Sequence, residues 1–163
     1  MKFLIPLLLA MGPCVFAQSS QARFTAGATT YGDDGAVTEA ALGAGIRFYL
    51  SNRWSVEPEF LHTWGSSGIV RSHSNILWGS VAFDFRNRDR KVVPYWFGGP
   101  GIVWHTSKFA QSSFTSTEAA AGTGGGVRVF LTDRLFVSPQ VRAGIADGVF
   151  AEATVSLGLI LRQ

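Results

Sequence analysis

One stretch of this chain occurs twice, and the repeat constrains the fold more than any other feature. Residues 43–59 recur as residues 124–140, with glycines, arginines, a leucine, a valine and a proline at matched positions. Each copy predicts a strand, a tight polar turn and a second strand. In the first copy Arg47, Glu57 and Glu59 share one face and large apolar residues share the other. A soluble barrel would bury the apolar face, whereas a barrel in lipid would turn the charged face inward. The alternation alone therefore does not decide which face lies inside.

The N-terminus has the pattern of a secretory signal peptide. A lysine follows the first methionine, and residues 3–11 are apolar. Val15 and Ala17 are small residues at the two positions that signal peptidase reads. We expect residues 1–17 to be removed. The apolar run is too short for a membrane anchor, which needs about 20 residues. A lipoprotein signal at Cys14 is the alternative, but a proline precedes this cysteine where such signals have a small, flexible residue.

Composition favours the orientation with charges inside. Charged residues make up 15% of the chain, whereas glycine, with 19 residues, and aromatic residues, with 13%, are abundant; an average soluble domain has roughly 25% charged residues. The net charge of +3, or +2 without Lys2, is small and scattered, which excludes a nucleic-acid surface. Without Cys14 the mature chain has no thiol chemistry. No later segment approaches a transmembrane helix, so an exported chain of this kind is expected to enter a membrane as a closed β-barrel.

Eight alternating segments follow one another in the mature chain. They are residues 22–31, 38–50, 54–64, 75–85, 92–105, 118–131, 135–145 and 149–161. Loops are expected at residues 65–74 and 106–117, and the glycine-rich residues 98–101 predict a bulge or a close approach of two strands. A strand of about 9 to 11 residues crosses a bilayer. The sequence therefore predicts an all-β fold, an eight-stranded antiparallel up-and-down transmembrane β-barrel, with short turns at the end that holds both termini and longer loops at the other.

The chain resembles small eight-stranded outer-membrane β-barrels of the OmpA and OmpX type, and more closely the porin-like or opacity-like barrel domains. The most specific part is residues 124–142, a glycine-rich strand, a Leu-Thr-Asp-Arg turn and the following strand. The C-terminal strand is also similar, in Ser156, Gly158 and Leu161, although the chain ends at Gln163 instead of an aromatic residue. The resemblance implies that residues 18–163 form an outer-membrane β-barrel domain, a monomer that contacts outer-membrane lipid and is recognised by the barrel-assembly machinery through its C-terminal strand.

Polar residues on the inward face are the candidate functional site. We predict a lumen network of Arg47, Glu57, Glu59, Arg128 and Arg142. The turn centred on Asn52 sets Arg47 directly opposite Glu57, where the two side chains can pair. The first interpretation is a plugged barrel with a structural or surface-interaction role. The alternative is a narrow passive diffusion channel.

A lipid A-modifying hydrolase is a third, weaker hypothesis, because some barrels that resemble this chain act on lipid A. Such chemistry needs a histidine beside a serine nucleophile, and residues two apart on a strand share a face. His105 and Ser107 have this spacing, and Glu118 is the candidate that would orient the imidazole. The deacylase-like motif continues with asparagine after the serine, whereas Lys108 follows here. We therefore expect no enzymatic activity. The three histidines are dispersed, so no metal and no cofactor are expected.

Overall fold

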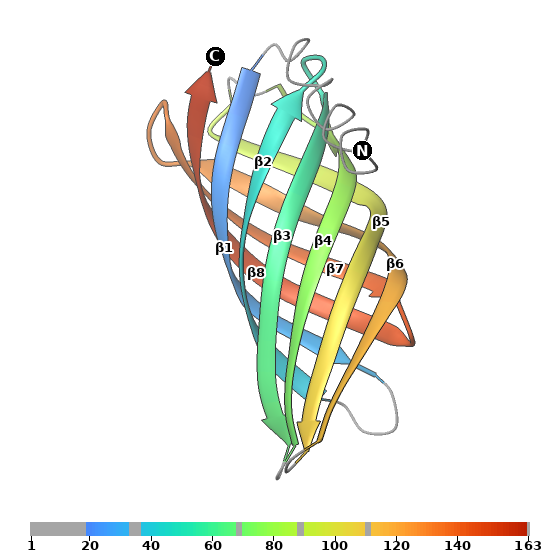
Figure 1. Cartoon of the computed structure of the whole chain (residues 1–163). Coiled ribbons are helices and arrows are strands. Elements are labelled where there is room, and N and C mark those ends of the chain that lie inside the picture. Colours follow the sequence, from blue (N-terminus) through green and yellow to red (C-terminus); the bar gives the residue numbers. More distant parts are fainter. Residues whose placement is uncertain (1–18, 33–36, 68–69, 88–89, 110–111, 163) are drawn as a thin grey trace, which may run out of the picture.

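The computed structural model describes residues 19–32, 37–67, 70–87, 90–109 and 112–162, so the expected signal peptide and Gln163 lie outside the described residues. Its elements are eight strands: β1 (Ser19–Tyr31), β2 (Val37–Tyr49), β3 (Trp54–Ser67), β4 (Val70–Asp84), β5 (Val92–Phe109), β6 (Ser112–Phe130), β7 (Leu135–Ile145) and β8 (Val149–Arg162). Each strand pairs antiparallel with the next, and β8 pairs with β1 (Figure 1). The predicted fold class, an eight-stranded antiparallel barrel, is confirmed.

The two faces of the sheet have opposite polarity, and the polar face lies inside. Along β8, Glu152, Thr154 and Ser156 are buried, whereas Val155 and Leu157 are about half exposed. The same alternation places exposed large apolar side chains on the exterior of every strand except β6, including Phe24, Leu42, Phe60, Leu77, Trp96, Ile102, Val141 and Leu159. An apolar exterior around a polar interior is the arrangement of a barrel in lipid and the reverse of a soluble one. None of the described residues forms a helix long and apolar enough to cross a membrane.

The two longest expected loops are strands instead. Residues 65–74 belong mostly to β3 and β4, and residues 106–117 mostly to β5 and β6. The register runs unbroken through the second region, from Val92 opposite Val129 to Phe109 opposite Ser112. Serine and threonine are typical of loops, but threonine also favours strands, and Thr106 here bonds Thr115 across the sheet. The expectation of longer loops at this end is therefore wrong.

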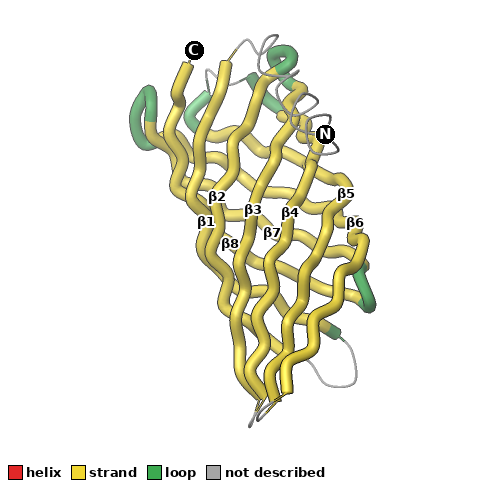
Figure 2. The backbone as a smooth tube through the Cα atoms, viewed as in Figure 1, coloured by secondary structure: helices red, strands yellow, loops and turns green. Residues whose placement is uncertain are grey.

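Strands β3 to β6 form an extension beyond the rest of the barrel. Pairing of β2 with β3 reaches only as far as Trp64, and pairing of β6 with β7 begins at Ala121. In Figures 1 and 2 these four strands continue to the tip that lies opposite the chain termini. Residues 112–120 of β6 thus form a strand edge that β7 does not cover.

The glycine-rich segment of β5 is a close approach and not a bulge, because its pairing with β6 is regular. A Cβ atom on Gly101 would overlap the indole ring of Trp78, and one on Gly99 would overlap the backbone of Gly79. Glycine at position 101 therefore leaves room for the ring of Trp78, which is 1% exposed. The guanidinium carbon of Arg142 lies 4.5 Å from the centre of the Trp78 ring, so this packing positions one member of the interior polar site.

Candidate functional site

The interior of the barrel contains a network of buried ion pairs. Four arginines and four carboxylates take part, namely Arg23, Arg47, Arg128, Arg142, Glu57, Glu59, Asp84 and Glu152. They come from every strand except β5, and each of the eight residues is at most 4% exposed. The charges are thus equal in number and largely withdrawn from water, the condition under which buried charges are tolerated.

Glu57 and Glu59 on β3 accept the first group of ion pairs. Arg47 on β2 bonds Glu57, since the register that pairs Gly45 with Glu59 and Phe48 with Val56 sets these two residues opposite each other. Arg23 bridges both carboxylates and lies 2.7 Å from an oxygen of Glu59. On the other side Arg142 donates to Glu59 at 2.6 Å and to Glu152 at 3.2 Å. Strands β1, β2, β3, β7 and β8 are thereby joined across the lumen.

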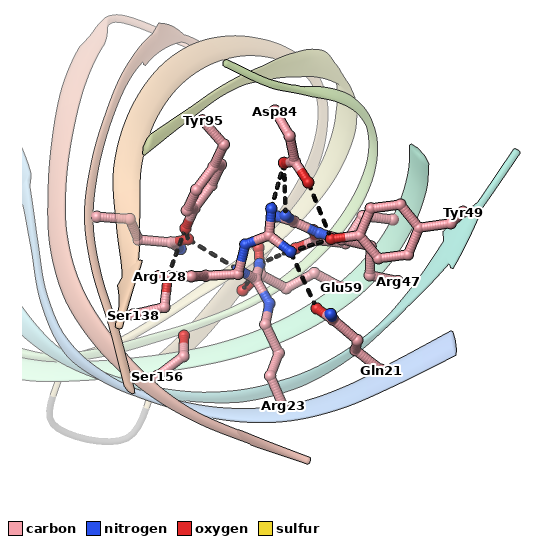
Figure 3. A network of polar contacts seen from close by, with 12 residues as sticks. Gln21, Arg23, Arg47, Tyr49, Glu59, Asp84, Tyr95, Arg128, Ser138 and Ser156 are labelled. Atoms are coloured by element: carbon pink, nitrogen blue, oxygen red, sulfur yellow. Dashed lines mark hydrogen bonds and ion pairs between the residues drawn. The ribbon is translucent and has the colours of Figure 1, made fainter. Parts of the chain in front are cut away.

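Asp84 and two tyrosines complete the network at the end nearer the termini. Arg128 on β6 donates to Asp84 and to the hydroxyl of Tyr49, and Arg47 lies 3.8 Å from the same carboxylate. Two guanidiniums lie over the ring of Tyr95. The guanidinium carbon of Arg47 is 4.5 Å from the ring centre and that of Arg128 is 5.2 Å from it. Figure 3 shows these side chains converging from opposite walls of the barrel.

Neutral side chains accept further hydrogen bonds from the network. Gln140 accepts from Arg23 at 2.8 Å and from the Tyr95 hydroxyl at 2.8 Å. Gln21 accepts from Arg128 at 3.3 Å. A void of about 10 Å³ remains among Arg23, Arg47, Arg128 and their neighbours, which is about the least that a single water molecule needs.

The structure brings together all five residues of the expected lumen network, and adds three. The three additional residues are Arg23 on β1, Asp84 on β4 and Glu152 on β8. Arg23 lies beside Arg47 because β1 pairs with β2 so that Arg23 opposes Gly45, a residue without a side chain. Its inward alternation with Gln21 and Thr25 was the available sequence signal.

A cavity of about 330 Å³ opens at the end of the lumen opposite the termini. It is lined by Tyr31, Val37, Glu39, Ser72, Val103, His105, Ser107, Glu118 and residues 146–149. The weak catalytic candidates therefore share one cavity. Among the described residues, no group of three or more His, Cys, Asp and Glu is placed to hold a metal ion.

The catalytic candidates lie close together but not as a catalytic triad. His105 Nε2 lies 2.8 Å from Ser107 Oγ, as the spacing predicts. The other ring nitrogen, Nδ1, lies 2.8 Å from Ser74 Oγ. Glu118 accepts a hydrogen bond from Ser116 at 2.7 Å, so the structure places a hydroxyl, and not this carboxylate, at the position that orients the imidazole in a triad.

Comparison with solved structures finds the same architecture in bacterial outer-membrane proteins. The N-terminal barrel of OprF from Pseudomonas aeruginosa matches with 14% identity over 86% of this chain and 97% of its own, at a TM-score of 0.67. Neisserial surface protein A matches with 13% identity over 86% of this chain and 95% of its own, at a TM-score of 0.71. Ail of Yersinia pestis matches with 16% identity over 90% of this chain and 99% of its own, at a TM-score of 0.64. No protein-family model matches the sequence, and no curated protein does. The chain thus has the fold of small outer-membrane β-barrels.

Proposed function

We propose that this protein is a monomeric outer-membrane barrel whose lumen is closed by the ion-pair network and which serves a structural or surface-interaction role. The observation that carries the proposal is the set of eight paired charges that reach across the lumen from seven strands. Each carboxylate faces at least one guanidinium. An ion that passed through would have to break these pairs without water to replace them, and breaking a buried pair costs several kcal/mol.

The apolar exterior supports residence in the outer membrane. Phe24 and Val141, for instance, are 71% and 61% exposed on the outside of the barrel. Side chains of this kind are stable in contact with lipid tails and unfavourable in water. Lipid is therefore the first partner. The barrel-assembly machinery is the second, and we propose that it recognises β8.

The extension of β3 to β6 supports the surface-interaction role. It continues the sheet past the point where β2 and β7 end, on the side away from the termini. Along residues 112–120 of β6 the backbone pairs with no described strand on the β7 side. An uncovered strand edge is a template on which an extended segment of another chain can pair.

Planar-bilayer recording of the refolded wild-type protein tests the closed lumen. We expect little conductance, because the void among the guanidiniums of the network has a volume of only about 10 Å³. A void of this size holds about one water molecule, whereas conduction needs a continuous path of water. Steady single-channel currents from the unmodified protein would overturn the closed barrel and make the narrow diffusion channel the better interpretation.

A further inference from the structure

In the cavity at the mouth of the lumen acidic side chains outnumber basic ones, since three carboxylates and the imidazole of His105 line it. Glu39, Glu118 and Asp147 line it, and none of the described residues that line it is an arginine or a lysine. The central network, by contrast, matches four carboxylates with four guanidiniums. The polar interior therefore has two zones, one neutral as a whole and one negatively charged.

Glu39 is the deepest of these acidic residues. It is 1% exposed, and its two carboxylate oxygens accept hydrogen bonds from Thr63, at 2.6 Å, and from Ser72. No ion pair joins Glu39 to a described cation. A buried carboxylate that remains charged needs a positive partner, because desolvation without one is costly.

A hydroxyl without a described hydrogen-bond partner lies on the strand next to Glu39, and a carboxylate oxygen without one lies one strand further. Thr29 on β1 is the cross-strand partner of Glu39 on one side and of Glu152 on the other. Thr29 is 1% exposed and Glu152 is 3% exposed, yet Thr29 Oγ1 and Glu152 Oε1 have no hydrogen-bond partner among the described residues. Of these three residues, Glu39 lines the cavity. An ammonium group, which has three donors and no acceptor, matches the carboxylate oxygens of Glu39 at the cavity wall.

The walls of the same cavity are apolar. Val37, Val103 and Tyr31 line it together with Glu39. An inorganic cation keeps its water and gains nothing from such walls, whereas an organic cation buries its carbon skeleton against them. A volume of about 330 Å³ lies at the lower end of the range for small-molecule sites.

We propose that the mouth cavity binds a small organic cation, with its ammonium group at Glu39 and its apolar body against the valines. The site lies beyond the central network and does not depend on whether that network closes the lumen. It gives the outward end of the barrel a selective affinity for amines.

Titration calorimetry on the refolded mature protein in detergent tests this with benzylamine as the probe. Benzyl alcohol, which has the same ring and no charge, is the matched ligand, and titration of empty micelles gives the background. We expect saturable binding of benzylamine and no saturable binding of benzyl alcohol. Glu39→Gln keeps an oxygen that can accept from one of the hydroxyls of Thr63 and Ser72 and offers an N–H to the other. It removes the charge and is expected to weaken benzylamine binding by about tenfold or more.

Two variants control the test. Asp133→Asn removes one negative charge from the segment between β6 and β7, at the other end of β7 from the cavity, and should leave the affinity for benzylamine unchanged. Val103→Phe keeps every carboxylate but fills the cavity, so it should abolish binding. A difference in gel mobility between unboiled and boiled samples verifies that each variant is folded.

Three results would each overturn the proposal. These are equal affinities for benzylamine and benzyl alcohol, an unchanged affinity in the folded Glu39→Gln variant, and saturable binding of Mg²⁺ without any binding of benzylamine. The first would leave an apolar pocket without charge recognition. The second would remove Glu39 from the site, and the third would make it a site for inorganic ions.

Discussion

Glu57 contacts the guanidiniums of both Arg23 and Arg47 and is 3% exposed. Its replacement by alanine leaves two buried cations with one carboxylate fewer, and removing one partner of a buried pair costs about 3 to 5 kcal/mol. We expect Glu57→Ala to lower the free energy of unfolding by this amount in urea titrations of the protein in lipid vesicles.

The control for this variant is Asp147→Ala, which removes an exposed carboxylate from the turn between β7 and β8. Exposed charges contribute about 0 to 1 kcal/mol. Equal urea midpoints for Glu57→Ala and the wild type would show that the network contributes nothing to stability.

His105 and Ser107 are within hydrogen-bond distance, so the enzyme hypothesis can be tested directly. The imidazole faces Ser74 and not a carboxylate, and the pair lines the lumen cavity, away from the lipid-facing exterior where lipid A would lie. We expect the acyl number of lipid A, measured by mass spectrometry of cells that express the protein, to be the same for the wild type, Ser107→Ala and His105→Ala. A change that requires both residues would revive the hydrolase.

At the scale of elements, β4 and β5 approach closely because glycine and tryptophan lie opposite each other. A methyl group on Gly101 would overlap the Trp78 ring, whereas one on Gly79 meets no atom within 4 Å. Forcing extra volume into such a contact costs about 1 to 3 kcal/mol. We expect Gly101→Ala to lower the urea midpoint and Gly79→Ala, on the neighbouring strand, to leave it nearly unchanged. Equal effects of the two substitutions would mean that the Trp78 contact is not what requires glycine.

The sequence predicts the strands where apolar and polar residues alternate strongly, as in β2, β7 and β8. It does not predict the outer parts of β3 to β6, because serine, threonine and glycine are as common in loops as in strands and their alternation has no polarity contrast. The pairing of Arg47 with Glu57 follows from one short turn. The contact between Arg23 and Gln140 does not, since it crosses the lumen between residues 117 positions apart and depends on how the closed barrel staggers its strands.

At the scale of the whole molecule, closure leaves every strand of the barrel with two neighbours along most of its length. A closed sheet has no edge within the bilayer from which detergent can begin to separate strands. We therefore expect the refolded protein to migrate differently in a detergent gel before and after boiling. A variant with proline in the middle of β8 at Val155, where the backbone pairs with both β1 and β7, is expected to lose this difference. Identical mobility of unboiled and boiled wild-type samples would contradict a closed barrel.

The long sequence separation of the network also sets an order of events in time. Arg23 on the first strand meets Gln140 on the seventh, and Arg142 on the seventh meets Glu59 on the third, so neither contact exists until distant parts of the chain have come together. Before then the nascent sheet carries eight charged groups on its concave side, each hydrated. Lipid opposes the entry of hydrated charge, so insertion of a partly assembled sheet is unfavourable. We therefore expect insertion to follow the approach of these distant strands, when the charges can pair.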